Sequence, residues 1–412
     1  MSGGRRARAR ANWHRVRGLP LPFWVMFADT FAMAVGFYLL IPLFAYHLLE
    51  NVALSATIVG VIAAVRTFSQ QGLMVWSGAL ADRIGYRNAI CAGVLIRAAG
   101  FGLFGLADSV PMFLAGSVLA GFGGSLFHPA SYATYAVLTD GADRVTIYSV
   151  RELLSNSGFI IGPVVGGLLL TFDFRWVCFV SAGLFAATAV LSWFGLPPLR
   201  RDAAVSRSFL AAVREVTSNR AFLHFTWVTG GAWALSTQLY LAVPVRAGEL
   251  LADASQLGRV YAVGAVVMVV TLVPLSRIAS QRLHAFHVMA AGTLLLGGGL
   301  LAIGFAPVAA ALYLGVVVFT LGQVLCQPMM NSLVSRFADP DRMASFFGVN
   351  GLALAVGGVV GNVGGGVLYQ LAQQPAWSAL PWLLFGCWAA GVAALYVRAA
   401  RVIDPPSETA SA

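Results

Sequence analysis

A glycine-rich stretch occurs twice in this sequence. It reads Gly158-Phe-Ile-Ile-Gly162-Pro163-Val-Val-Gly166-Gly167 and returns 199 residues later as Gly357-x-x-x-Gly361-x-x-x-Gly365-Gly366. Glycines four residues apart lie on one face of a helix and allow another helix to approach closely. The same register holds upstream, where Gly123 and Pro129 recur as Gly322 and Pro328, and Asp143-Arg144 recurs, one residue out of step, as Asp341-Arg342. Chance similarity between apolar segments rarely preserves glycine and proline spacing, so the chain contains two related halves.

The composition is that of a membrane protein. Of 412 residues, 59% are hydrophobic and only 10% are charged, against about 25% charged in an average soluble domain. A membrane helix needs about 20 apolar residues, and segments of this kind occur near 21–45, 56–79, 88–107, 110–137, 147–171, 174–195, 221–244, 256–277, 283–305, 308–334, 343–370 and 378–398. We therefore predict an all-α membrane protein with twelve transmembrane helices in two pseudo-symmetric six-helix bundles.

The arginines predict the orientation of the chain. All 26 basic residues are arginine; 6 lie in the N-terminal tail, 5 in the central loop and 9 more on the same side, whereas the opposite loops carry only Arg175 and Arg246. Because cytoplasmic loops carry the excess of basic residues, both termini are expected in the cytoplasm. The predicted organisation is a tail (1–20), a bundle (21–197), a linker (198–219), a second bundle (220–400) and a tail (401–412).

The loop between the second and third spans carries a motif. It reads Gly78-Ala-Leu80-Ala-Asp82-Arg83-Ile-Gly85-Tyr86-Arg87. Glycines allow a tight turn between helix ends, and a carboxylate near a helix N-terminus contributes about 0.3–1 kcal/mol. The stretch resembles the loop motif G-x-L-a-D-R-x-G-R-[RK] of the major facilitator superfamily, with Tyr86 in place of the first closing basic residue.

That resemblance implies a conformational latch. Asp82 is expected to cap the eleventh span across the two halves and to hold an outward-facing state, and Arg83 or Arg87 is expected to pair with Asp140. An ordinary basic cytoplasmic loop is the alternative interpretation.

The glycine-rich stretch of span 5 is similar to G-x-x-x-G-P-x-x-G-G, the signature of the drug:proton antiporter branch of that superfamily. Pro163 removes a backbone donor and bends the helix, whereas Asn362 stands at this place in the second half. Packing of small residues without any role in antiport is the alternative. The resemblance covers about Pro20 to Arg401, and its multidrug-resistance members are matched most closely at Arg66–Gly72, Gly78–Arg87, Ile96–Phe101 and Gly121–Pro129.

Ionisable residues within a bilayer are costly and indicate function. By the helical rise of about 1.5 Å per residue, Asp29 lies about 12 Å and Arg66 about 18 Å from the cytoplasmic ends of their spans. We expect the two to meet and Asp29 to be the proton-responsive carboxylate, although a static ion pair is the alternative. Ser117 occupies the place of the span-4 arginine common in drug:proton antiporters, so Arg66 or Arg97 would take its role.

Other charges in or near the spans are Arg151, Glu152 and Arg259. The adjacent pair Arg151 and Glu152 lies near the membrane surface, so an interfacial position is favoured for it. Polar and aromatic residues that could line a central substrate cavity are Tyr38, Gln70, Gln71, Phe127, His128, Asn156, Gln238, Tyr240, Gln323, Gln327 and Asn331.

The function predicted from these features is secondary active, proton-coupled export of small amphipathic compounds or drugs through a bacterial inner membrane. The alternative is a carrier for one metabolite, such as a sugar, an amino acid or a siderophore, working by proton coupling or as a uniporter. No G-x-x-x-x-G-K-[ST], H-E-x-x-H or G-x-S-x-G sequence is present, which argues against an enzyme or an ATP-driven pump. We expect no cofactor, no metal, no nucleic acid partner, and a monomer in the lipid bilayer that handles a small molecule and protons.

Overall fold

The computed structural model describes residues 19–139, 144–199, 218–251, 255–337 and 343–402, and all regular structure in these ranges is helical. The core of a bilayer holds no water that could bond to the backbone. A segment that crosses it therefore forms a helix, in which the backbone donors and acceptors bond to one another. Asp140 lies outside the described residues, so its expected pairing with Arg83 or Arg87 stays a prediction.

The first half contains the helices α2 to α8. Their bounds are α2 Leu21–Tyr46, continued by the π-helical turn η1 His47–Asn51, α3 Ala56–Gln71, α4 Met74–Ile84, α5 Tyr86–Leu106, α6 Val110–Leu138, α7 Arg144–Leu170 and α8 Phe174–Gly195. The turn from α4 into α5 is made at Gly85, whose φ of 89° favours glycine. The tight turn expected from the loop motif is therefore present.

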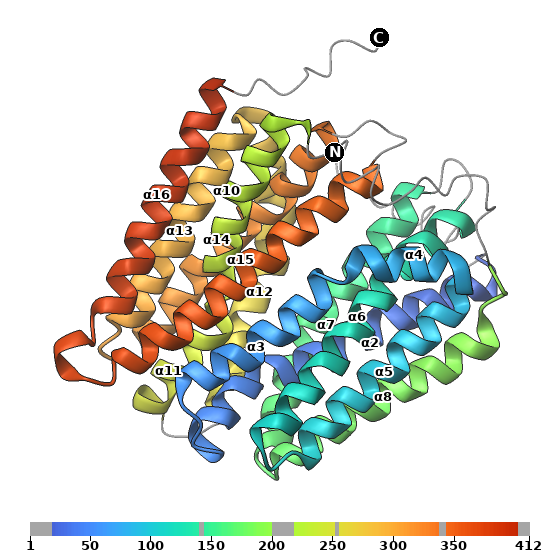
Figure 1. Cartoon of the computed structure of the whole chain (residues 1–412), viewed down its shortest axis with the longest axis horizontal. Helices are drawn as coiled ribbons and strands as arrows, with labels where there is room; N and C mark the ends of the chain where they lie inside the picture. The colour runs from blue at the N-terminus through green and yellow to red at the C-terminus, as the bar shows by residue number, and fades with distance from the viewer. Residues whose placement is uncertain (1–18, 140–143, 200–217, 252–254, 338–342, 403–412) are drawn as a thin grey trace, which may run out of the picture.

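The second half contains the helices α10 to α16. Their bounds are α10 Arg220–Ser236, α11 Leu239–Leu250, α12 Ser255–Arg282, α13 Ala285–Gly304, α14 Ala309–Phe337, α15 Met343–Leu371, the 3-10 turn η5 Pro375–Trp377 and α16 Leu380–Val402. Figure 1 shows α10 to α16 gathered on one side of the molecule and α2 to α8 on the other.

Two of the twelve predicted spans are interrupted. Within the described ranges, ten helices are long and apolar enough to cross a membrane, and an eleventh span results if α3 and α4, which meet at a bend of 43°, are taken together. The predicted span 221–244 is divided between α10 and α11 at Thr237 and Gln238. These two breaks were not predicted, since sequence hydropathy does not show where a helix breaks.

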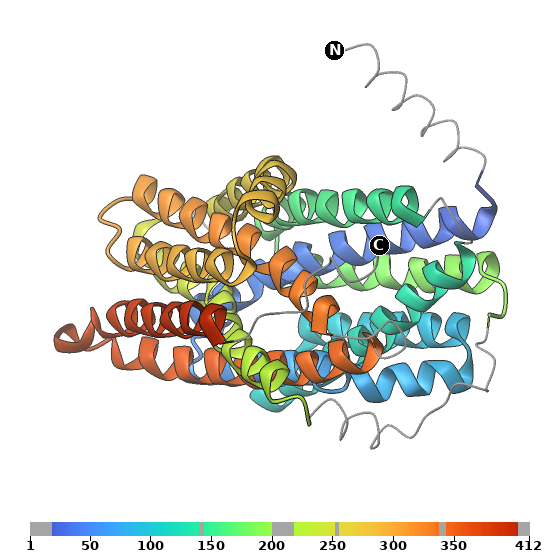
Figure 2. The ribbon, with the colours of Figure 1, turned by 90° about the horizontal axis from the view of Figure 1, so that it is seen from above.

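Most of the contact between the two halves is made by three pairs of helices. In the first half α5 packs on α6 and α8, and α2 packs on α7; in the second, α13 packs on α14 and α16, and α10 packs on α15. Between the halves, α3 packs along α15, α7 packs on α12, and α2 contacts α11. The view from above in Figure 2 shows the same two groups of helices from a second side.

The repeated glycines explain the packing within each half. A Cβ on Gly158 would lie 2.5 Å from Cβ of Ala34 on α2, and one on Gly357 would lie 2.1 Å from the Gly230 carbonyl oxygen on α10. Such distances leave no room for a side chain. The glycine stripes on α7 and α15 therefore let the fifth span pack on the first and the eleventh on the seventh.

The opposite edge of each stripe forms the contact between the halves. A Cβ on Gly258 of α12 would lie 2.7 Å from the Pro163 carbonyl oxygen, and one on Gly60 of α3 would lie 2.3 Å from the Asn362 carbonyl oxygen. Because Pro163 and Asn362 are 199 residues apart, the two seams are equivalent by the internal repeat. We call them the α7–α12 seam and the α3–α15 seam.

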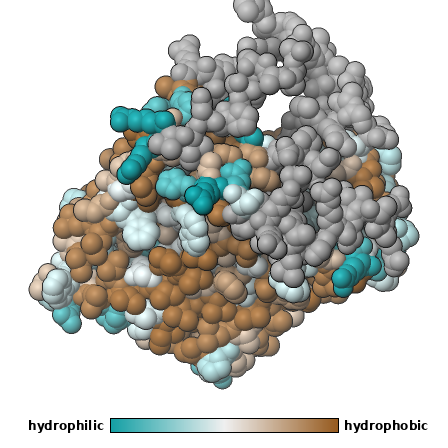
Figure 3. Space-filling view, turned by 45° about the horizontal axis from the view of Figure 1, so that its top comes forward, coloured by the Kyte–Doolittle hydropathy of each residue, from teal (hydrophilic) through white to brown (hydrophobic). Residues whose placement is uncertain are grey.

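The surface is broadly apolar. Large exposed hydrophobic residues include Phe194, Phe172, Val273 and Trp76, and Figure 3 shows hydrophobic colour over most of the visible described face, with hydrophilic side chains gathered mainly near one end. An apolar surface of this extent is suited to lipid, since soluble monomers rarely expose large contiguous apolar patches.

Candidate functional site

Two arginines of the first half share one aromatic ring. The guanidinium carbon of Arg97 on α5 lies 4.8 Å, and that of Arg66 on α3 lies 5.4 Å, from the ring centre of Phe37 on α2. Arg97 is only 2% exposed and also lies over Phe101 and Phe185. Cation–π contacts of this kind contribute about 0.5–2 kcal/mol each. Three helices thus form a cationic site, which we call the arginine pair.

Glycines on α6 create the space for Arg97. A Cβ on Gly124 would lie 2.7 Å from one terminal nitrogen of Arg97 and 3.3 Å from the amide carbon of Gln70. Arg97 and Gln70 therefore approach the same point on α6. The side-chain amide oxygen of Gln70 is buried without a hydrogen-bond partner. The predicted cavity residue Gln70 does lie beside a predicted coupling residue.

The second half contributes Tyr240 to this site. Tyr240, near the start of α11, is close enough to interact electrostatically with Tyr38 and Arg66. Tyr38 is in turn held by the rings of Phe37 and Phe159, at centroid distances of 5.1 and 4.5 Å. The structure therefore brings the two predicted cavity tyrosines, from different halves, to the arginine pair.

Asp29 lies elsewhere. Its side chain is fully buried and accepts a hydrogen bond of 2.6 Å from Ser192 on α8, while its other carboxylate oxygen has no partner. Phe37, which contacts Arg66, is eight residues further along α2, or about 12 Å at 1.5 Å per residue. The expected meeting of Asp29 with Arg66 was wrong, because Asp29 faces the interior of the first bundle. Ser192 was missed, since a lone serine in an apolar span carries no sequence signal.

The loop motif is arranged around its own helix ends. Asp82 is exposed and accepts a hydrogen bond of 3.0 Å from the Tyr86 hydroxyl. Arg87 lies 4.8 Å from the ring centre of Trp193 at the end of α8, while Arg83 is exposed. The non-basic Tyr86 thus gives Asp82 a local partner, and the capping of the eleventh span by Asp82 stays a prediction.

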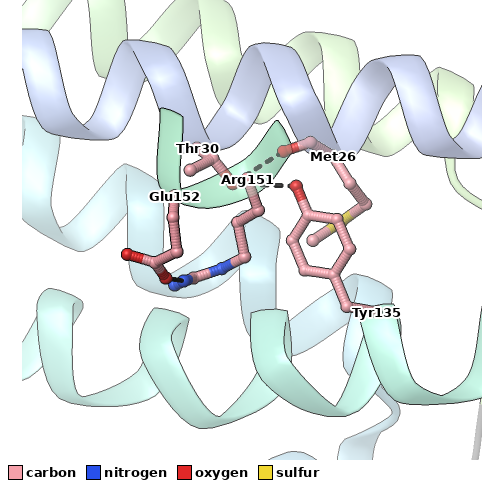
Figure 4. Close-up of polar contacts among 5 residues, drawn as sticks. All are labelled: Met26, Thr30, Tyr135, Arg151 and Glu152. Carbon is pink, nitrogen blue, oxygen red and sulfur yellow. Dashed lines mark hydrogen bonds and ion pairs between the residues drawn. The ribbon is translucent and has the colours of Figure 1, made fainter. Parts of the chain in front are cut away.

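Arg151 and Glu152 differ in exposure, although an interfacial position was expected for both. The two side chains form an ion pair, yet Arg151 is buried whereas Glu152 is largely exposed. The Arg151 guanidinium lies 4.1 Å from the ring centre of Tyr132, and Figure 4 shows Arg151 close to Tyr135, whose hydroxyl bonds to Thr30 on α2 at 2.9 Å. Thr30 also donates to the Met26 carbonyl, so this cluster links α2, α6 and α7.

Gln238 does not face a cavity. It is 0% exposed, and its amide nitrogen donates to the carbonyl oxygens of Ala234 and Gly361 at 3.0 and 2.8 Å. The expectation that Gln238 lines the substrate cavity was wrong, because its side chain satisfies carbonyl groups at the break between α10 and α11.

Three side-chain amides form a stripe along α14, and their exposure differs along it. Gln323 is 7% exposed, whereas Gln327 and Asn331, at four-residue intervals on the same face, are exposed. Such spacing places the three on one side of the helix. The side chains of this stripe therefore become more exposed towards the Phe337 end of α14.

The other predicted cavity residues lie in mixed surroundings. Phe127 is buried, while His128, Gln71 and Asn156 are half-buried. His128 is within electrostatic range of both Arg97 and Arg151, which are both buried.

Arg259 is separate from all of these. It is exposed and lines a groove of about 460 Å³ on α12 and α14 with Tyr313 and four small apolar residues. None of the predicted site residues lines this groove. Among the described residues, no group of three or more His, Cys, Asp or Glu side chains could hold a metal ion.

Comparison with known proteins identifies the family. A profile of the Major Facilitator Superfamily matches residues 26–362. The chain belongs to this superfamily. It is a multi-pass membrane transporter and not an enzyme, as the sequence predicted.

Relatives and solved structures extend the likeness. The multidrug resistance protein MdtH of Aeromonas salmonicida (strain A449) is 31% identical over 363 residues, 88% of this chain and 91% of that protein. MdtH of Proteus mirabilis (strain HI4320) is 30% identical over 88% of this chain and 90% of its own length. These matches confirm the expected likeness to multidrug-resistance members of the superfamily.

Solved structures confirm the fold alone. A mutant of the nucleoside transporter NupG superposes with a TM-score of 0.80 at 13% identity, covering 92% of this chain and 99% of that one. A POT family transporter in complex with 5-aminolevulinic acid gives a TM-score of 0.73 at 14% identity, covering 93% of this chain and 97% of its own. The major facilitator fold is therefore established.

Proposed function

We propose that this superfamily member exports small amphipathic compounds or drugs by alternating access, in exchange for protons. The observation that carries the proposal is the repeat-related pair of seams, with the arginine pair, Tyr38 and Tyr240 where the halves meet. Parallel repeats with a central site between them are the arrangement that supports rocking of one half against the other. The MdtH name of the relatives favours drugs over a single metabolite.

The packing favours access from the cytoplasm, if both termini lie there as the arginines predict. At the far end of the bundle, the Ala56 backbone amide donates to the Gln370 side chain across the α3–α15 seam at 3.0 Å. Gly258 packs on Gly167 at the same end of the α7–α12 seam. The amide stripe of α14 is exposed towards the opposite, cytoplasmic end. We propose that the bundles 21–197 and 220–400 move as the two bodies of this cycle.

Asp29 is the proposed proton-responsive carboxylate. An ionised carboxylate in an apolar bundle costs free energy that one hydrogen bond from Ser192 does not offset, and protonation removes this cost. Cys91 on α5 is within electrostatic range of both Asp29 and Arg87.

The test is dye export from proteoliposomes with an imposed pH gradient. We expect Asp29→Asn to abolish gradient-driven movement, while Asp108→Asn, an exposed acid between α5 and α6, leaves it unchanged. Ser192→Ala keeps the carboxylate and is expected to shift the pH dependence of export without abolishing it. Full gradient-driven export by Asp29→Asn would refute the assignment of the proton site, and export that ignores the gradient in the unmodified protein would refute proton antiport.

A further inference from the structure

Among the described residues, no acid forms an ion pair with Arg66 or Arg97. In the described ranges the ion pairs are Arg151 with Glu152 and Arg246 with Glu249. Asp29 is not among the groups that act electrostatically on Arg66 or Arg97, whereas the two arginines repel each other. A buried charge without a partner is costly, and aromatic faces offset only part of that cost.

The packing of α5 on α6 does not need the charge of Arg97. A Cβ on Gly123 would lie 2.5 Å from the backbone nitrogen of Arg97, and one on Gly322 would lie 2.8 Å from that of Leu296. Leu296 thus occupies in the second half the place that Arg97 occupies in the first, in the same packing of two helices. A leucine is sufficient for that packing, so the charge of Arg97 has another use.

The groups around the arginine pair supply two kinds of contact. The Arg97 Nε is buried without a hydrogen-bond partner, and Arg66 has only a long contact of 3.5 Å with the Thr67 hydroxyl. Phe37, Tyr38 and Tyr240 are half-buried beside these donors. The site therefore offers unused cationic donors next to aromatic faces.

We propose that the arginine pair binds the anionic group of an organic acid whose apolar or aromatic body lies against Phe37, Tyr38 and Tyr240. Guanidinium groups bind carboxylates through strong, charge-assisted hydrogen bonds. This inference rests on the proposed export function and specifies the charge of its substrates. Neutral and cationic compounds lack the group that compensates the two arginines.

The test compares three probes that share one ring system. Binding of 2-naphthoate, 2-naphthamide and 2-naphthylmethylammonium to the purified full-length protein in detergent at pH 7 is measured by titration calorimetry. We expect the acid to bind at least about tenfold more tightly than the amide, as a hydrogen-bonded charge predicts, and the ammonium to bind most weakly. Equal affinity for acid and amide, preference for the ammonium, or no binding of the acid would overturn the proposal.

Variants separate binding from packing. Arg97→Leu copies the second half and is expected to fold and to lose the preference for the acid, while Arg259→Gln, on the outer groove, keeps it. If Arg97→Leu gives no folded protein by gel filtration, Arg66→Gln serves instead and should reduce the preference for the acid. Unchanged preference in a folded variant would contradict the proposal.

A transport assay distinguishes this inference from the export function. Gradient-driven movement of the amide and the ammonium, without preference for the acid, would leave export standing and refute the arginine pair as an anion site. Movement of none of the three probes under a pH gradient would count against both.

Discussion

Gly60 on α3 and Gly366 on α15 face each other so closely that a Cβ on Gly60 would lie 3.1 Å from the Gly366 Cα. The α7–α12 seam repeats this relationship, since a Cβ on Gly258 would lie 3.0 Å from the Gly167 Cα. Both seams join helices of different halves, so a change in their separation is a change in how the halves fit together.

We predict that Gly60→Val and Gly258→Val each abolish transport, because an added side chain would meet backbone atoms that cannot move aside locally. Overpacking of this kind costs about 1–3 kcal/mol, so the melting temperature should fall as well. Gly298→Val on α13 is the matched control, because nothing lies within 4 Å of its Cβ position. Normal transport by the two seam variants, in folded protein, would show that the seams need not close.

Gln238→Ala should destabilise the protein. It would remove the hydrogen bond that joins the break between α10 and α11 to the Gly361 carbonyl oxygen on α15, while Thr237 still donates to the Ala234 carbonyl oxygen. Loss of such a hydrogen bond costs about 0.5–1.5 kcal/mol. The exposed Gln327→Ala on α14 is the control and should keep the parent melting temperature in detergent. Equal melting temperatures for the two variants would contradict the structural role of Gln238.

Tyr135→Phe should lower stability by about 1 kcal/mol, because it removes the hydroxyl that bonds to Thr30 across α2 and α6. Tyr132→Phe keeps the ring beneath Arg151 and should have almost no effect. Denaturant unfolding followed by tryptophan fluorescence measures the difference. A larger loss for Tyr132→Phe would mean that the ring contact with Arg151 is not what Tyr132 supplies.

The sequence predicted the repeat, the helices and the close packing of the glycine faces, because glycine spacing in a helix determines which face packs closely. It did not show which helices those faces would meet. It singled out Asp29, Arg66 and Arg97 as candidates because charges are rare in apolar spans. It could not find their partners, since the rotation of each helix about its axis decides whether Asp29 faces Ser192 or Arg66. The place of Gln238 was predicted wrongly for a related reason. Hydropathy shows an apolar span but not the break between α10 and α11, where the Gln238 side chain donates to carbonyl oxygens.

The central claim is that the seams open and close during transport, and a cross-link across the α3–α15 seam tests it most directly. Ala56→Cys and Gln370→Cys are introduced together with Cys387→Ser, because Cys387 is the exposed native cysteine of the described residues. The backbone of Ala56 and the side chain of Gln370 are hydrogen-bonded at 3.0 Å, so a short, reducible bifunctional thiol reagent can join the two positions.

The measurement is gradient-driven export in proteoliposomes before cross-linking, after it, and after reduction, with each single cysteine variant as a control for the reagent. Alternating access predicts that export stops when the cross-link forms and returns when it is reduced, while the single variants are unaffected. Undiminished export by fully cross-linked protein would contradict the account.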